Sequence, residues 1–167
     1  MKSFHVSVSA EAFAAALFAQ AGYDVSVQYG ANQPEYDLLV SKNNHILKVS
    51  VKGTQIEGWG LAQTYKQKDI SYHAAIDLWK KNHKSKHVIY CFVQLQNGQL
   101  GQMPKVYLST ISEISKHLKA QRDGHAHCSL FVEHTYTSGI AKGITDKIPD
   151  DWMFSEKRIR QLLKSAT

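Results

Sequence analysis

The amino-acid sequence predicts an α/β fold with a mixed central β-sheet flanked by helices. Alternating apolar segments joined by a tight turn predict antiparallel strands, and helical segments between other strands predict crossovers. The chain has 167 residues, which suits a single domain over 1–167 with a core large enough to fold alone.

The predicted helices lie at 9–21, 70–82, 109–122 and 155–166, and the predicted strands at 23–29, 36–40, 46–52, 87–96, 105–109 and 128–133. The first helix shows apolar residues at helical spacing, with Ser9 as a cap for its first turn and Gly22 as its stop. The segment that follows alternates and is rich in valine and tyrosine, which is typical of a strand.

The clearest local prediction is a hairpin over residues 36–52. Asn43 and Asn44 tolerate left-handed backbone, so they suit the turn between its two strands. Because side chains alternate along a strand, Ser50 and Lys52 share one face of the second strand.

The rest of the chain alternates helices and strands with two loop-rich segments. Residues 53–69 show no regular period and carry three glycines, so they predict a loop. Residues 87–96 form a continuous apolar run, which indicates a buried central strand. The segment 134–150 is loop-rich, and Ser155 is placed to cap the last helix.

Composition bounds the partners of the chain. The formal charge is +6, with nine histidines besides, and this balance favours a polyanionic partner such as nucleic acid. No apolar run approaches the roughly 20 residues of a membrane helix, so no membrane contact is expected. Cys91 lies within an apolar run, far from Cys128, which predicts a buried thiol in a reduced, cytoplasmic protein.

The predicted hairpin carries an acid and a base at its ends. Asp37 opens the first strand and Lys52 ends the second, so the two converge at one edge of the sheet if the hairpin is bent. An acid there can hold a divalent cation, Mg²⁺ first and Mn²⁺ as the alternative, and the cation polarises a phosphate oxygen. A lysine can orient the nucleophile and offset the negative charge that builds on the phosphate.

The order of these segments resembles that of the PD-(D/E)xK nuclease superfamily. In this chain the first helix offers Glu11, and the first hairpin strand offers Asp37, with Pro34 three residues before it. The second hairpin strand offers the sequence SVK at 50–52. The resemblance covers roughly residues 9–96 and implies a restriction-endonuclease-like core.

The resemblance also implies roles for individual residues. Asp37 would be the main metal ligand, Glu11 an accessory ligand, and the main-chain carbonyl of Val51 would complete the metal shell. Lys52 would be the catalytic lysine. The strands and helices of 103–167 would complete the sheet and pack on it.

Ser50 departs from the family pattern, which has an aspartate or glutamate at that position. A serine hydroxyl is a neutral and weaker ligand for a hard cation, so metal affinity should fall. Three interpretations follow. An acid from elsewhere replaces it, with Glu35, Glu57 and Asp69 as candidates; or the site binds metal weakly and still works; or catalysis has been lost.

Two classes of function therefore stand open. The first is a metal-dependent nuclease that cleaves phosphodiester bonds in DNA. The second is a catalytically degenerate domain of the same fold that binds nucleic acid or a protein partner. A purely structural or dimerising protein is a third, weaker alternative. Many proteins of this fold act as dimers, so a homodimer is also an open alternative.

Residues outside the motif extend the prediction of nucleic-acid contact. Those expected to touch nucleic acid are Thr54 and Gln55 just after the motif, Trp59 as a base-stacking residue of an exposed loop, and Lys80, Lys81 and Lys84 in a lysine cluster.

The histidines do not predict a zinc site. His125, His127 and Cys128 are followed by His134, and this spacing matches no standard zinc motif, so a turn with two solvated histidines is expected. Trp152 lies among apolar residues ahead of the last helix and is expected in the core.

Overall fold

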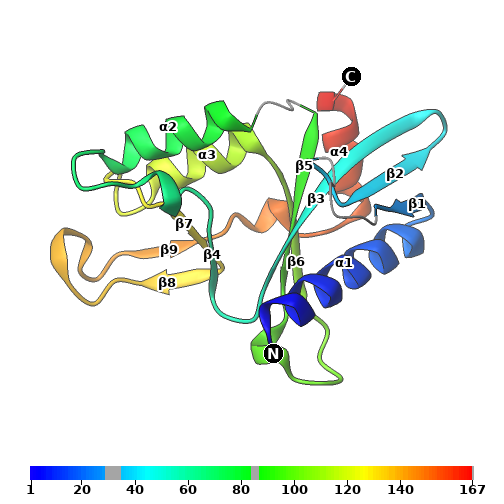
Figure 1. Ribbon diagram of the computed structural model, residues 1–167, viewed down its shortest axis with the longest axis horizontal. Coiled ribbons are helices and arrows are strands. Elements are labelled where there is room, and N and C mark those ends of the chain that lie inside the picture. Colours follow the sequence, from blue (N-terminus) through cyan, green and yellow to red (C-terminus); the bar gives the residue numbers. More distant parts are fainter. Residues whose placement is uncertain (29–34, 84–86, 167) are drawn as a thin grey trace. The chain divides into compact units, whose positions relative to one another are not determined.

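The computed structural model describes residues 1–28, 35–83 and 87–166 (Figure 1). The chain divides into two compact units. Unit 1 comprises Met1–Ile56, His87–Thr110 and Asp150–Thr167, and unit 2 comprises Glu57–Lys86 and Ile111–Pro149. The single domain expected from chain length stays a prediction. None of the described helices is both long and apolar enough to cross a membrane.

Unit 1 contains the mixed sheet that the sequence predicts, in the order β1-β2-β3-β5-β6. Its strands are β1 (Asp24–Val27), β2 (Leu38–Lys42), β3 (His45–Thr54), β5 (Val88–Gln94) and β6 (Lys105–Thr110). The pair β3–β5 is parallel, and the other neighbouring pairs are antiparallel. The predicted fold class, α/β with a mixed central sheet flanked by helices, is therefore confirmed.

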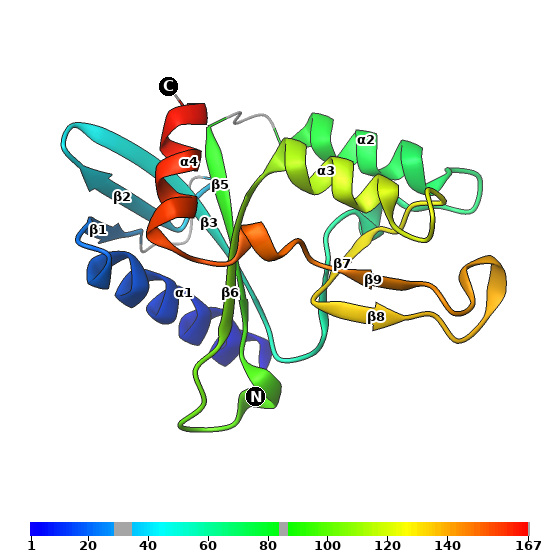
Figure 2. The ribbon, with the colours of Figure 1, turned by 180° about the vertical axis from the view of Figure 1, so that it is seen from behind.

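Helices α1 (Ser3–Gln20) and α4 (Glu156–Ala166) pack on the apolar face of this sheet (Figures 1 and 2). From β3 this face receives Leu47, Val49 and Val51, which lie at alternate positions, as the side chains of one strand face must. In β5, Cys91 is fully buried, as predicted, and its thiol is free.

The first helix begins at Ser3, six residues before the predicted start at residue 9. Its buried stripe is Val6, Ala10, Ala14 and Phe18, and this i, i+4 spacing continues through the segment that precedes Ser9. Ser9 therefore lies inside the helix and is not its cap. Burial of Val6 against the sheet outweighs the strand-like alternation of the local sequence.

The hairpin predicted over 36–52 is confirmed. Asn43 and Asn44 have φ values of 50° and 64°, and Lys42 pairs with His45 on either side of them. Two consecutive residues with positive φ are what a two-residue type I′ turn requires. The second strand runs to Thr54, because β5 pairs with β3 along that whole stretch.

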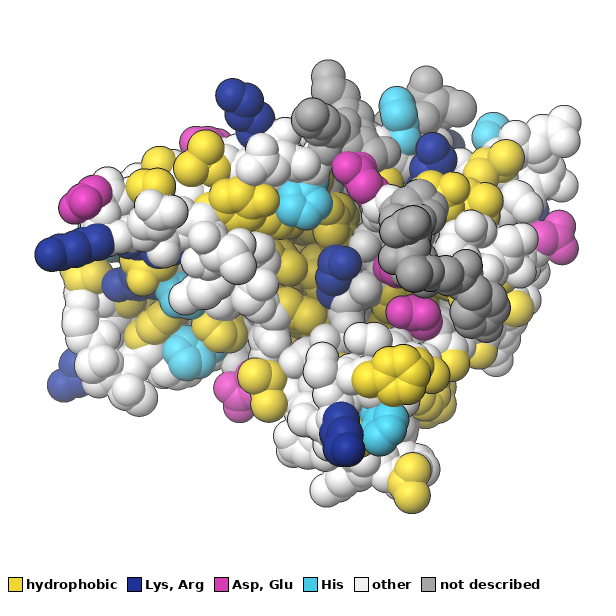
Figure 3. Space-filling model, in the orientation of Figure 1, with side chains coloured by type: hydrophobic (Ala, Val, Ile, Leu, Met, Phe, Trp, Pro, Cys, Tyr) yellow, Lys and Arg dark blue, Asp and Glu magenta, His cyan; other side chains and the backbone are white. Residues whose placement is uncertain are grey.

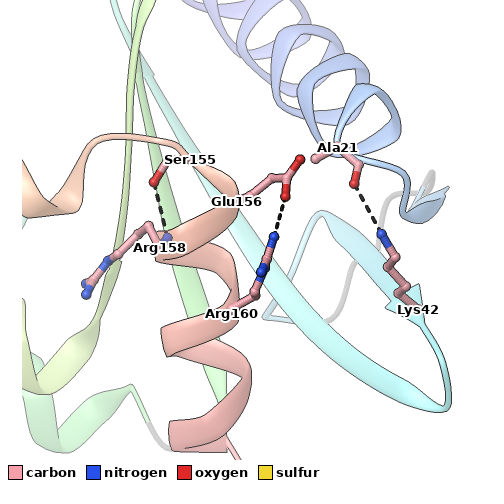
Figure 4. A network of polar contacts seen from close by, with 6 residues as sticks. All are labelled: Ala21, Lys42, Ser155, Glu156, Arg158 and Arg160. Atoms are coloured by element: carbon pink, nitrogen blue, oxygen red, sulfur yellow. Dashed lines mark hydrogen bonds and ion pairs between the residues drawn. The ribbon is translucent and has the colours of Figure 1, made fainter.

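Polar contacts hold α4 and the end of α1 within unit 1 (Figure 4). The Ser155 hydroxyl accepts the amide of Arg158 at 3.1 Å, which confirms the predicted cap. Arg158 is buried and donates from Nε to the Leu108 carbonyl at 3.1 Å. Lys42 donates to the Ala21 carbonyl at the end of α1, a favourable place for a cation.

Unit 2 combines α2 (Tyr72–Asn82) and α3 (Ile111–Ala120) with two small sheets. One sheet pairs β4 (Gly58–Gly60) with β7 (Ser129–Phe131), and the other pairs β8 (Glu133–Thr135) with β9 (Thr145–Lys147). The predicted loops therefore contain short strands. Of the strands predicted after residue 103, β6 joins the central sheet, whereas β7 pairs with β4.

Gly53 allows α1 to approach β3 closely. A Cβ atom at residue 53 would lie 2.7 Å from the Ala10 Cβ and 3.0 Å from the Val6 carbonyl oxygen. Both neighbours belong to the rigid body of α1, so neither can move without shifting the helix.

We predict that Gly53→Ala lowers the free energy of unfolding by about 1–3 kcal/mol, because the added methyl overpacks the α1–β3 contact. Urea unfolding measures this change. Gly60→Ala is the matched control, since a Cβ there meets only the Gln63 Cβ at 3.8 Å. Equal stability of the Gly53→Ala variant and the unmodified protein would contradict the close approach.

Candidate functional site

The backbone of Asp37 is held on both sides. Its amide donates to the Val49 carbonyl of β3 at 2.8 Å, and its carbonyl accepts the Gln28 amide at 2.9 Å. Asp37 directly precedes Leu38, the first residue of β2, which pairs with Val49 of β3. Its backbone bonds therefore attach it to the sheet just beyond β2. The position of its side chain is therefore set by the sheet and not by a loop.

The carboxylate of Asp37 contacts β3 directly. Its Oδ2 accepts the amide of Val51 at 2.6 Å and the hydroxyl of Ser50 at 3.4 Å. The first bond is short and charge-assisted, so it restrains the carboxylate strongly. The sequence required a bent hairpin to bring Asp37 near Ser50, and the structure places the two side chains in contact directly beyond the last paired residues, Leu38 and Val49.

The main chain of Val51 adds a further oxygen to this edge. In a strand the N–H and C=O groups of one residue point to the same side. Because the Val51 amide is bonded to Asp37, its carbonyl faces the same edge of β3. The side chain of Val51 is buried in the core, so only its backbone contributes to the site.

Glu11 of α1 belongs to the same electrostatic cluster. The pKa of Glu11 is raised, first by burial and then by the negative charge of Asp37, while the positive charge of Lys52 lowers it. Coulomb interactions weaken with distance, so Glu11 lies within the electrostatic range of both Asp37 and Lys52. Three residues that are far apart in the sequence are thus brought together in unit 1.

Lys52 and Ser50 lie on one face of β3, as the alternation predicted. Ser50 is buried, with 4% of its surface exposed, whereas Lys52 is exposed. A neutral hydroxyl thus lies beneath the Asp37 carboxylate, and the lysine lies one step further along the same face. Asp37 also raises the pKa of the Cys91 thiol, second to burial, which places its charge close to β5 as well.

The three alternative acids, Glu35, Glu57 and Asp69, belong to different parts of the chain. Glu35 is exposed, and its resolved influence is to raise the pKa of Tyr90, after burial. Glu57 and Asp69 belong to unit 2. Among the described residues there is no group of three or more His, Cys, Asp and Glu side chains that could hold a metal. The site therefore offers two carboxylates, from Asp37 and Glu11.

Thr54 and Gln55, predicted to touch phosphate, instead make contacts within the chain. Thr54 is buried, and its hydroxyl accepts the Ile56 amide at 3.2 Å. The Gln55 amide group accepts from the Met1 amino group at 2.8 Å and donates to the Met1 carbonyl at 3.2 Å. Both side chains thus fix the end of β3 and the start of α1.

The stacking role predicted for Trp59 is wrong. Trp59 lies in β4, pairs with Leu130 of β7 and exposes only 5% of its surface, so no base can stack on it. Lys80 and Lys81 are exposed in the last turn of α2, as a lysine cluster on the surface requires. Lys84 lies outside the described residues, as does Pro34.

The predicted pair of solvated histidines is also corrected. His125 is exposed, but His127 stacks on Tyr72 with ring centroids 5.6 Å apart, and burial lowers the pKa of His127. Sequence reasoning missed this environment. The alternation of histidine and aromatic residues from 127 to 136 was a signal that could have revealed it.

Comparison with known proteins finds no matching family model, no curated relative and no similar solved structure at significant similarity. We therefore infer function from the arrangement of Glu11, Asp37 and Lys52.

We predict that Asp37→Leu lowers the free energy of unfolding by about 1–3 kcal/mol relative to Asp37→Asn, because leucine leaves the Val51 amide without an acceptor. Both variants remove the charge, so their difference isolates the hydrogen bond. Chemical unfolding of the two proteins measures it, and equal stabilities would show that the bond contributes little.

Proposed function

We propose that this chain is a metal-dependent nuclease that cleaves phosphodiester bonds in DNA, with the PD-(D/E)xK type of site. The observation that carries the proposal is the anchoring of the Asp37 carboxylate to β3 beside Lys52, with Glu11 within electrostatic reach. Asp37 and Lys52 at a sheet edge, with Glu11 on the adjacent helix α1, suit phosphodiester hydrolysis better than any other chemistry of this donor set.

The donor set fits Mg²⁺. Carboxylates of Asp37 and Glu11, the Val51 carbonyl and the Ser50 hydroxyl are all hard oxygen donors. Mg²⁺ is commonly held by one or two carboxylates together with waters and substrate phosphates, so two acids suffice. The pKa of Glu11 is raised by burial and then by the negative charge of Asp37, and a bound divalent cation would offset that repulsion. Mn²⁺ accepts the same donors.

Each residue has a definable task in this chemistry. A bound cation would polarise the phosphate and acidify a water molecule. Asp37, restrained by the Val51 amide, holds its ligand oxygen at a fixed position, and Glu11 supplies the second charge from α1. Lys52 orients the attacking water and offsets the negative charge that develops on the phosphate. Because the pKa of Glu11 is raised, its ligand form is lost at a higher pH than for an ordinary glutamate.

A second candidate, a degenerate domain of the same fold that binds nucleic acid or a protein, is favoured by one observation. Ser50 occupies the place of the second acid, and no third acidic, histidine or cysteine ligand joins the site among the residues described. Without added charge, metal affinity would be low, and catalysis could be lost while the fold persists.

Cleavage of supercoiled plasmid distinguishes the two candidates. We expect nicking with Mg²⁺ or Mn²⁺ that EDTA abolishes, and we expect Asp37→Asn and Lys52→Met each to slow it about 100-fold or more. Lys48→Met is the matched control, because Lys48 is exposed on the same face of β3, so it should leave the rate unchanged.

No cleavage of plasmid, single-stranded DNA or RNA by the unmodified protein would favour the degenerate domain. Equal loss in the Lys48→Met control would show that general surface charge, and not the site, supports the activity.

We predict that Ser50→Asp lowers stability in EDTA and regains it with Mg²⁺, because a third carboxylate would be buried beside Asp37. The Mg²⁺ concentration at half-maximal stabilisation should fall about tenfold as the ligand charge rises. Thermal melting across a Mg²⁺ titration measures both effects. Ser50→Asn is the uncharged control, and an equal response in it would rule out a metal site at this edge.

A further inference from the structure

Unit 2 contains an aromatic cluster that the proposed hydrolytic site does not use. It consists of Tyr72, His127, Phe131, His134 and Tyr136. The His134 ring stacks on Phe131 with a centroid distance of 4.5 Å and meets Tyr136 edge-on at 4.7 Å. His127 lies 5.2 Å from Phe131 and 5.6 Å from Tyr72, so the rings form one continuous group.

The aromatic cluster is not a closed core. All five rings are partly exposed, whereas the fully buried apolar side chains of unit 2 are others, such as Leu118 and Leu130. Figure 3 shows histidine side chains beside hydrophobic ones over the part of unit 2 that contains β7 and β8. Part of the surface of each of these five residues thus remains accessible.

Two cations lie over these rings. The Arg122 guanidinium carbon is 5.4 Å from the centre of the Tyr72 ring and 5.7 Å from that of Tyr136. The Lys66 Nζ is 5.2 Å from the centre of the Tyr72 ring. Cation–π contacts of this kind preorganise a cation without neutralising it.

The acid next to Arg122 does not engage the guanidinium in any described hydrogen bond. Asp146 accepts the main-chain amide of Arg122 at 3.0 Å and the hydroxyl of Tyr136 at 2.8 Å. The Nε of Arg122 is buried and has no hydrogen-bond partner among the described residues. A buried donor without an acceptor is costly. Arg122 as a whole is partly exposed, so its positive charge can attract an anion.

We propose that the aromatic cluster with Arg122 and Lys66 binds unpaired nucleotides of a single nucleic-acid strand. The rings provide faces for bases, and the two cations provide contacts for phosphates, which is the combination that single-strand binding sites use. An anion alone would not require five partly exposed rings, and an apolar ligand would not require two cations. This inference does not rest on the hydrolytic site of unit 1.

The test measures binding in EDTA, so that no cleavage is involved. Fluorescence anisotropy follows a labelled oligothymidylate of about 12 nucleotides. A second oligomer has the same length and phosphates, with abasic residues in place of the thymidines. We expect the abasic oligomer to bind about 10-fold more weakly, because it cannot stack. An oligouridylate in parallel tells RNA from DNA, and base-dependent binding of either supports the site.

Variants locate the binding within unit 2. Tyr136→Leu and His134→Ala should each weaken oligothymidylate binding about 5- to 100-fold and leave abasic binding unchanged. Arg122→Gln should weaken both oligomers. Lys116→Gln is the matched control, since Lys116 is exposed on α3 of the same unit, and it should change neither. Tyr136→Phe keeps the ring and should bind as the unmodified protein does.

Three results would overturn the proposal: equal binding of the base-bearing and abasic oligomers, unmodified affinity in both ring variants, or equal losses in Lys116→Gln and Arg122→Gln. Circular dichroism checks folding, and if Tyr136→Leu does not fold, His134→Ala decides the outcome. Because cleavage is absent from this assay, its failure is distinct from failure of the hydrolytic function.

Discussion

The unit 1 site depends on the hydrogen bond between the Val51 amide and the Asp37 carboxylate. Here β2 has ended, and β3 continues without a neighbouring strand on that side. A carboxylate replaces the missing strand as the acceptor, so one interaction satisfies the backbone of β3 and restrains a charged group. The same bond directs the Val51 carbonyl to this edge. One contact therefore serves both the strand backbone and the proposed chemistry.

The second constraint is the close contact between α1 and β3. Gly53 and the alanines of the buried helix stripe let the two backbones approach, and this approach carries Glu11 toward Asp37. Burial and then the negative charge of Asp37 raise the pKa of Glu11, which disfavours its charged form in the folded protein. Such a local conflict is typical of functional sites, where a ligand resolves it. Ser50 limits the conflict, because a third charge at a buried position would increase the repulsion.

The charged groups of unit 2 are arranged differently from those of unit 1. In unit 1 the carboxylate of Asp37 bonds to the main chain of β3, and Glu11 and Lys52 lie within electrostatic range of one another. In the aromatic cluster, cations rest on tyrosine faces, and the neighbouring acid Asp146 is engaged by a main-chain amide and a hydroxyl. Asp146 thus positions Arg122 while leaving its guanidinium donors for an anion. The two proposals, phosphodiester hydrolysis in unit 1 and base stacking in unit 2, each rest on the arrangement within one unit.

The sequence by itself determined the features that depend on neighbouring residues. The Asn43-Asn44 turn, the Ser155 cap, the buried run of β5 and the shared face of Ser50 and Lys52 all follow from local backbone preference or strand alternation. Tertiary structure alone decided the rest. The start of α1 depends on burial of Val6, and Trp59 is buried because β4 pairs with a strand about 70 residues away along the chain. His127 is partly buried because Tyr72 of α2 stacks on it. Pairings between distant segments leave no local period in a sequence, so the aromatic cluster became visible only in the folded chain, whereas the acid cluster was expected only through the family resemblance.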